Sequence, residues 1–454
     1  MRVSFHGAAG GKVSGSCHRI EFDKKGKDQA LLDCGSFMAE KGSQDFGFDP
    51  QNPKWLLLSH GHWDHFGRIV SLVKKGFNGE IIATAPTKAI TEFSTLDSAR
   101  YNRRRENRFA SDSPEQYTVE DVRKTISLFG REAVYGKPIK LSKNVTAVFF
   151  DAGHMLGSAS VLLEINEGGI IRRLTFSGDI GNSNKPIICN PTLPPKSDFV
   201  IMETLYGDRP HRPFIQSTEE FYNAINDAFK RKGNVVIPAF AVSRSQEILY
   251  LLRAGLENKK LPKRMVAFLD SPSAIKATKV FRNYPDFFDE EAKELVKRGK
   301  DPFSFPNLTF TEKVSDSKQI NDVKNGAVIV AASGMGTGGR IMYHLKQNLP
   351  RPESSVVVAN FAAKGTLVRD IVDGKKIVNI LGEEIPVRAK IYTINGFSGH
   401  GGQTELVNWQ GATGTPATTF LVHAEEKQRQ AFAQILKARG LNIEMPDMHE
   451  SFKI

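Results

Sequence analysis

The sequence predicts an α/β protein in which stacked β-sheets are combined with a parallel α/β unit. In the first 200 residues, short apolar runs rich in β-branched and aromatic residues are separated by Gly, Asp and Asn turns, which is typical of packed sheets. After Tyr206 the pattern changes to a strand followed by a helix, repeated several times, which is typical of a parallel sheet covered by helices. A chain of 454 residues is long enough for two or three domain-sized units.

The expected elements follow in chain order. The expected strands of the first part are residues 2–5, 30–33, 55–59, 145–151, 159–164 and 172–177. The expected strand–helix pairs of the middle part are residues 235–238 with 246–252, 266–269 with 275–281, and 327–332 with 340–349. Two more expected pairs, 389–395 with 403–408 and 418–422 with 425–438, follow in the last part.

Composition narrows the class of protein. Cys17, Cys34 and Cys189 are too few and too widely spaced for a disulfide framework or a CxxC metal site, so we expect reduced thiols. No secretory leader and no apolar run of membrane-spanning length stand out, so we expect a cytoplasmic protein without membrane contact. The net charge of +12, to which an arginine-rich run from Arg100 to Arg108 contributes, predicts a polyanionic partner, because neutralising phosphates releases counterions.

Three imidazoles and a carboxylate crowd one predicted strand-to-helix turn. His60, His62, Asp64 and His65 directly follow the apolar strand that ends near Ser59. Imidazole and carboxylate groups are ligands suited to zinc, and two histidines one residue apart can reach one ion while the following pair reaches a second. A polar surface loop is the alternative, but few structural needs place these four residues together.

Two further segments have the same form, a predicted strand that ends in a ligand-type residue. His154 follows the strand ending at Asp151, and Asp179 follows the strand ending at Ser177. Each segment alone is more typical of an ordinary turn or a core histidine. Together with the first cluster they supply a third imidazole for one zinc and a carboxylate able to bridge two ions, as two-metal phosphoesterases require.

At this point the chain resembles a known superfamily. Asp33, the run from His60 to His65, His154 and Asp179 stand in the order and spacing of the four metallo-β-lactamase motifs. Residues 203–209, 397–400 and 421–425 resemble motifs A, B and C of the β-CASP subfamily, whose members cut nucleic acids. The resemblance, closest to bacterial relatives of the polyadenylation endonuclease, implies an αββα metallo-β-lactamase sandwich with an inserted parallel α/β β-CASP domain. It implies residues 1–206 and 367–454 for the sandwich and 207–366 for the inserted domain.

The resemblance also implies a role for each motif residue. It implies two Zn²⁺ per chain, with the ligands His60, His62 and His154 for one ion, Asp64, His65 and His423 for the other, and Asp179 bridging both. Asp33 is implied to orient a ligand imidazole, and a hydroxide held between the metals to attack phosphorus. His400, held by Glu203, is implied to protonate the leaving oxygen. The candidates for substrate contact are Ser333, Gly365, Thr366 and Ser398.

We therefore expect a zinc-dependent ribonuclease that hydrolyses single-stranded RNA mainly internally, with 5′ to 3′ exonuclease activity as a second mode. His423 favours RNA, because in the family a His in motif C accompanies RNA-cutting members, whereas DNA-repair members tend to carry Val. The alternatives are a DNA nuclease of the same fold and a non-catalytic RNA-binding protein. The sequence leaves open which RNA is cut and whether the chain forms a homodimer.

Overall fold

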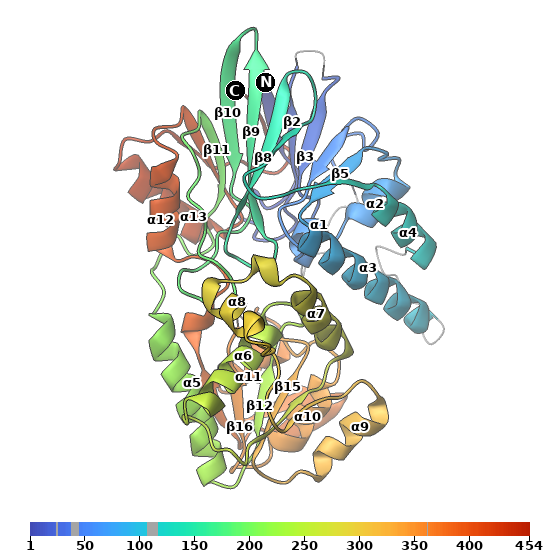
Figure 1. The fold of residues 1–454 in the computed structure, drawn as a ribbon, viewed down its shortest axis with the longest axis vertical. Coiled ribbons are helices and arrows are strands. Elements are labelled where there is room, and N and C mark those ends of the chain that lie inside the picture. Colours follow the sequence, from blue (N-terminus) through green and yellow to red (C-terminus); the bar gives the residue numbers. More distant parts are fainter. Residues whose placement is uncertain (24–25, 38–44, 107–116, 361) are drawn as a thin grey trace. The chain divides into compact units, whose positions relative to one another are not determined.

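The computed structural model describes residues 1–23, 26–37, 45–106, 117–360 and 362–454, with backbone only for 101–106. The chain forms two compact units, which Figure 1 shows as ribbons. The first unit contains Met1–Ser183, Asn190–Pro210 and Gly399–Ile454. The second contains Asn184–Cys189 and His211–Ser398.

The first unit is built on two seven-stranded sheets. In spatial order, the strands of the first sheet are β22 (Ser451–Lys453), β1 (Arg2–Phe5), β2 (His18–Glu21), β3 (Gln29–Leu32), β4 (Trp55–Leu57), β5 (Glu80–Ala83) and β6 (Phe129–Glu132). The strands of the second sheet are β21 (Ile443–Glu444), β20 (Thr418–Val422), β11 (Phe199–Glu203), β10 (Ile170–Phe176), β9 (Ala159–Glu167), β8 (Val145–Asp151) and β7 (Pro138–Lys140).

The two sheets of the first unit pack face to face around one apolar core. Alternate residues of the strands point into this core, for example Phe5 from the first sheet and Phe149, Val161 and Phe420 from the second. Because every second side chain of a strand faces the same way, the opposite faces are also apolar and need a cover. The first unit therefore has a layer of helices outside each sheet.

Helices complete the four layers. The helices on the side of the first sheet are α1 (Trp63–Phe66), α2 (Ile69–Lys74), α3 (Ala85–Glu106) and α4 (Val119–Ser127). Phe66 and Leu72 of α1 and α2 pack on Leu56 of β4, and Val122 of α4 packs against Val70 of α2. The other sheet is covered by α12 (Gln403–Ala412) and α13 (Glu426–Lys437), which lie beside β11 in Figure 1 and join its core.

The second unit is a parallel α/β layer structure. The spatial order of its main sheet is β14 (Leu308–Phe310), β13 (Val266–Leu269), β15 (Ala327–Ala331), β12 (Val235–Pro238), β16 (Ser355–Val358) and β19 (Lys390–Thr393). All neighbouring strands in this sheet run parallel. The central strands β15, β12 and β16 are buried at every residue, which explains their almost wholly apolar sequences. A separate hairpin is formed by β17 (Ile377–Ile380) and β18 (Glu383–Pro386).

Helices lie between the strands of the second unit. They are α5 (Phe214–Lys230), α6 (Arg244–Glu257), α7 (Pro272–Asn283), α8 (Glu290–Lys297), α9 (Val314–Gln319), α10 (Ile341–Asn348) and α11 (Leu367–Val372). The core on one sheet face joins Ile341 of α10 and Val368 of α11 to Val236 of β12. Val235 and Ile237 alternate to the opposite face, so the sheet needs a second helical layer. Hydrogen bonds join α5, α6 and α7 into one group. Tyr222 of α5 donates to the Leu251 carbonyl of α6 at 2.9 Å, and Gln246 Nε2 of α6 donates to Thr278 Oγ1 of α7 at 2.9 Å.

The predicted fold class is confirmed, and the expected strands and helices occur within a few residues of their predicted positions. The junctions between the units differ from the predicted domain boundaries. Residues 367–398, which the sequence analysis grouped with the closing segment of the sandwich, belong to the second unit. The physical reason is strand pairing, because β19 pairs with β16 and α11 joins the core of the second sheet.

The structure bears on two predictions made from composition, the absence of membrane contact and the arginine-rich run. Among the described residues, no helix is both long and apolar enough to cross a membrane. The arginine-rich run lies, apart from Arg100, outside the side chains that the structure describes.

Candidate metal centre

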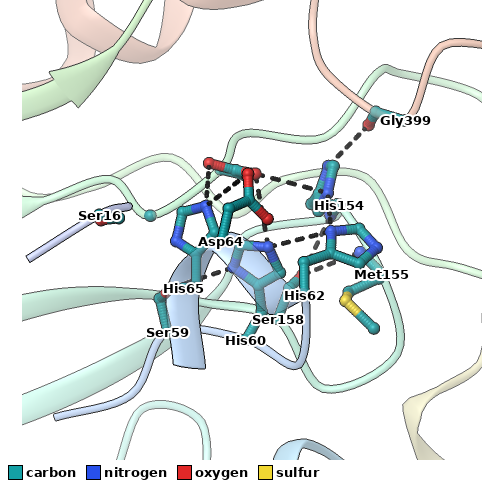
Figure 2. A network of polar contacts seen from close by, with 12 residues as sticks. Ser16, Ser59, His60, His62, Asp64, His65, His154, Met155, Ser158 and Gly399 are labelled. Carbon is teal, nitrogen blue, oxygen red and sulfur yellow. Dashed lines mark hydrogen bonds and ion pairs between the residues drawn. The ribbon is translucent and has the colours of Figure 1, made fainter. Parts of the chain in front are cut away.

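The first group of candidate ligands lies on the turn after β4. His60 follows the buried strand end, His62 is the N-cap residue of α1, and Asp64 and His65 lie in that helix. The short helix turns Asp64 and His65 back toward the strand end, and His65 N donates to His62 O at 2.9 Å. Figure 2 shows the side chains of these residues turned toward one another and toward His154.

The remaining candidates follow the carboxyl ends of strands in the second sheet. β8, β10, β11 and β20 run in the same direction, because β10, β11 and β20 are parallel and β9 is antiparallel to both β8 and β10. His154, Asp179, Glu203 and His423 therefore meet at one edge of the sheet. His423 has a φ of +56°, a left-handed conformation that turns the chain sharply at the end of β20.

Four ligand atoms converge in a first group. His62 Nδ1 lies 3.1 Å from His60 Nε2 and 3.0 Å from His154 Nε2. Asp179 Oδ2 lies 3.4 Å from His60 Nε2 and 3.6 Å from His154 Nε2. A tetrahedral zinc with bonds of about 2.0–2.1 Å separates its nitrogen ligands by about 3.3 Å, so these four atoms fit the corners of a zinc site.

A second group shares Asp179. His65 Nε2 lies 3.2 Å from both His423 Nε2 and Asp179 Oδ1, and Asp64 Oδ2 lies 3.5 Å from His423 Nε2. Asp179 thus presents Oδ2 to the first group and Oδ1 to the second, the arrangement of a bridging carboxylate. Asp179 Oδ1 is buried and makes no hydrogen bond to any described residue, as expected for an oxygen that binds a cation.

The electrostatics of the two groups differ. Burial lowers the pKa of His60, His62 and His154, and that of His62 falls to about 3. These three imidazoles are therefore neutral at pH 7. Burial also opposes the charged form of His423, but Asp179 and Asp64 outweigh it and raise its pKa to about 9. The pKa of His65 is raised in the same way against burial, chiefly by Asp179 and Asp33. Zinc binding at the second group must therefore release protons.

The distal ring nitrogens of three candidate ligands are held by partners outside the metal groups. His65 Nδ1 lies 2.7 Å from Asp33 Oδ2, His60 Nδ1 lies 3.0 Å from Ser59 Oγ, and His154 Nδ1 lies 3.1 Å from the Gly399 carbonyl oxygen. A carbonyl or carboxylate oxygen only accepts, so Nδ1 of His65 and His154 carries a proton, and Nε2 is the nitrogen left to bind a metal. Asp33 thus lies where the sequence analysis expected it.

Ser59 and Gly399 were not predicted. Ser59 also donates its backbone N–H and its hydroxyl to Asp33, at 2.8 and 2.9 Å, which links the partners of His60 and His65. Its position beside His60 is a sequence signal that could have indicated this role. Gly399 acts through its backbone carbonyl, which no residue pattern reveals.

His400 and Glu203 form a pair next to the metal groups. His400 Nδ1 lies 3.0 Å from Glu203 Oε1 and 3.8 Å from Asp179 Oδ2. Ile180 N donates to the same Glu203 oxygen at 2.8 Å, so the carboxylate is fixed from both sides. His400 Nε2, on the other side of the ring, points away from Glu203, and the side chain is 19% exposed. The pair can orient an imidazole for proton transfer.

The predicted substrate contacts all lie in the second unit. Ser333 Oγ contacts Thr337 Oγ1 at 3.1 Å within a glycine-rich loop. The Thr366 hydroxyl is the N-cap of α11 and donates to Ala363 O at 2.7 Å, and Gly365 has a φ of +79°. Ser398 directly precedes Gly399 in the chain. Their contact with a substrate stays a prediction.

Comparisons with known proteins point to the same class. Residues 10–239 match the model of the Metallo-beta-lactamase superfamily, and residues 245–371 match the Beta-Casp domain. Residues 384–446 match the model described as Zn-dependent metallo-hydrolase RNA specificity domain.

Full-length relatives are also found. The chain is 36% identical to "Ribonuclease TTHA0252" of Thermus thermophilus, over 100% of both chains. It is 28% identical to "Transcription termination factor FttA" of Methanocaldococcus jannaschii, over 96% of this chain and 69% of that protein. It is 27% identical to "RNase J-like protein" of the same organism, over 96% of this chain and 95% of that protein.

Proposed function

Because the chain belongs to the metallo-β-lactamase superfamily and carries its Beta-Casp domain, we propose that it is a ribonuclease that uses two zinc ions to hydrolyse single-stranded RNA. The observation that carries the proposal is the pair of ligand groups that share Asp179. Within the described residues, six imidazole and carboxylate side chains besides Asp179 contribute to these two groups. Buried side chains of this kind would be costly to desolvate without a cation between them.

The ligand roles follow from the distances. His60, His62, His154 and Asp179 would hold one zinc, and Asp64, His65 and His423 the other, together with Asp179 through its Oδ1. When bound, two zinc ions would activate the attacking water and neutralise the charge that builds on the phosphoryl oxygens. No side-chain nucleophile is required.

The leaving oxygen needs a proton, and we propose that His400 supplies it. Glu203 holds His400 Nδ1, so the proton to be transferred sits on Nε2, which points away from the carboxylate. We assign Glu203 the role of orienting the imidazole and stabilising its charged form. The contact of His400 with the metal-binding carboxylate Asp179 keeps this group next to the reacting phosphate.

RNA is the proposed substrate for three reasons. A match to an RNA specificity model covers residues 384–446, and two of the relatives named above are called ribonuclease or RNase. The net charge of +12 favours a polyanion. We further propose that Ser333, Gly365, Thr366 and Ser398 contact phosphates, and that internal cleavage is the main mode.

The test is cleavage of a 5′-labelled single-stranded RNA and of the same sequence as DNA, by protein of known metal content. Wild type is compared with the double variant Asp64→Ala, His65→Ala, and with the control Asp447→Ala, His449→Ala, which removes an exposed pair of the same residue types. We expect about two zinc ions per wild-type chain and RNA cleavage by wild type and control alone.

The other outcomes separate the alternatives. Preferred cleavage of the DNA would identify a DNA nuclease. RNA binding without cleavage, unchanged in the double variant, would identify a non-catalytic RNA-binding protein and refute the proposal. The length of the first labelled product distinguishes internal cutting from cutting at the 5′ end.

A further inference from the structure

His18 is a buried titratable residue that the proposed reaction does not use. It begins β2 and its side chain is 0% exposed. Burial first, then the neighbouring His6, His65 and His423, lower the pKa of His18 to about 3, so the ring is neutral and carries one donor and one acceptor. Neither ring nitrogen has a hydrogen-bond partner in the described part of the chain. Buried polar groups are rarely left in this state.

His423 also has a buried ring nitrogen with no hydrogen-bond partner among the described residues. Its Nε2 faces the second ligand group, within 3.2–3.6 Å of His65, Asp64 and Asp179. Nδ1, on the other side of the ring, therefore points away from the group into the protein. It is buried and makes no hydrogen bond to a described residue. The other imidazoles with Nε2 in a ligand group, His60, His65 and His154, each have a partner at Nδ1.

His18 lies beneath the same edge of the sheets. Its ring centroid is 5.3 Å from that of Phe5, which in turn is 5.2 Å from Phe420 on β20, three residues before His423. The ring of Phe176, the last residue of β10, is 5.5 Å from His18. His18 therefore contacts the end of β10, which leads to Asp179, and is linked through Phe5 to β20, which leads to His423.

We propose that His18 is the outer hydrogen-bond partner of His423, reached through one buried water that accepts from His423 Nδ1 and donates to His18. The inference rests on the proposed two-zinc site. A neutral His18 offers the acceptor that this water needs, and a buried water commonly joins two or more such groups. The link fixes the ring orientation by which His423 presents Nε2 to the second zinc. His18 is a positioning residue, since it touches neither metal nor substrate.

The test measures zinc affinity. His18→Leu removes both ring nitrogens, His18→Gln keeps a polar group of similar reach, and His6→Leu is the control. His6 is also a buried histidine, but its ring nitrogens contact Ser4 Oγ at 2.9 Å and His449 Nδ1 at 3.3 Å. Zinc is titrated into metal-free protein in competition with a chromophoric chelator. We expect His18→Leu to bind the zinc of the second ligand group about 10- to 100-fold less tightly than wild type does. The affinity for the zinc of the first group should be unchanged.

His18→Gln is expected to restore most of this affinity, and His6→Leu to match wild type. Equal affinity for both zinc ions in wild type and His18→Leu would overturn the inference. If His18→Leu does not fold, a high-resolution structure of the wild-type zinc protein decides, because density for a water between His18 and His423 Nδ1 is expected and its absence refutes the link. A wild-type chain that binds no zinc would instead refute the proposed function.

Discussion

At the scale of single residues, Asp179 and Asp33 occupy different places in the candidate metal centre. Asp179 reaches both ligand groups, whereas Asp33 contacts only His65 of the second group. We expect Asp179→Ala to abolish binding of both zinc ions. Asp33→Asn should weaken the zinc of the second group by about 10- to 100-fold and affect the other less, because Asp33 contacts His65 directly whereas His60 keeps its contact with Ser59 Oγ. Zinc content measured over a series of buffered zinc concentrations checks this, and loss of both ions in Asp33→Asn would contradict it.

The role of His400 can be separated from that of the metals by the choice of leaving group. We expect His400→Ala to retain both zinc ions but to cut RNA about 100- to 10,000-fold more slowly, because the departing ribose oxygen needs a proton. The rate of hydrolysis of bis(p-nitrophenyl) phosphate should fall far less, because nitrophenolate is a stable anion and leaves without being protonated. Glu203→Gln should also slow RNA cleavage more than hydrolysis of bis(p-nitrophenyl) phosphate, but by a smaller factor than His400→Ala.

The contrast between the two substrates is the critical readout. An equal loss on both substrates would show that His400 acts on the attacking water or on phosphate binding, and would exclude it as the acid.

Single residues also show what a sequence can reveal about a site. The side chains that converge here stand at the ends of apolar strands, so their pattern predicted the cluster. The partners of those side chains were harder to predict. Gly399 acts through its carbonyl oxygen, and His18 lies far from any ligand in the chain, so neither leaves a local signature.

At the scale of elements, the second unit depends on a buried charge at the end of β13. Asp270 is fully buried and accepts hydrogen bonds from Thr311, Ser317, Arg340 and His344 at 2.5–2.7 Å. It thereby joins β13 to α10. Burial alone would raise the pKa of Asp270, but the hydrogen bonds, led by that from His344, outweigh it and lower the pKa to about 2.

We expect Asp270→Asn to destabilise the protein by on the order of 3 kcal/mol at pH 7, because Arg340 loses its buried partner. The folded pKa lies below the ordinary value of 3.8, so the charge of Asp270 stabilises the fold above pH 4, and this contribution is lost as the pH falls toward 2. Urea unfolding of wild type and variant at pH 7 and pH 3.5 should show a smaller difference at the lower pH.

An exposed ion pair supplies the control for that experiment. Asp373 pairs with Arg369 at the end of α11, and the two side chains are 47% and 40% exposed. Asp373→Asn should unfold close to wild type at both pH values. A pH-independent deficit in Asp270→Asn would show that lost packing, rather than the lost charge, destabilises the variant.

Elements with long apolar runs were predictable, and short or exposed ones were not. Four strands of the second sheet, β8, β9, β10 and β20, and three strands of the second unit, β12, β13 and β15, were expected from their apolar sequences. β6, β7, β17 and β18 have three or four residues each, at least half of them exposed, which is too short for a clear period. Pairing partners were not readable from the sequence, so the pairing of β19 with β16 was not expected.

At the scale of the whole molecule, the excess of positive charge should govern RNA binding. Each phosphate neutralised on single-stranded nucleic acid contributes a slope of about −0.7 to the dependence of log affinity on log salt. If about three phosphates are neutralised, raising KCl from 50 to 200 mM should raise KM for RNA roughly 20-fold. KM for bis(p-nitrophenyl) phosphate, with one charge, should change little. The same salt response for both substrates would show that salt acts on the fold or the metals instead.

The order in which the candidate ligands appear along the chain has a consequence for protein synthesis. β20 pairs with β11, yet some two hundred residues are translated between them, and His423 follows β20 as the last of the metal-binding side chains. A nascent chain on the ribosome that ends before residue 418 lacks β20 and His423, so it cannot complete the second ligand group. Prematurely terminated polypeptides would thus be unable to degrade transcripts, and nuclease activity would appear only after translation has passed His423.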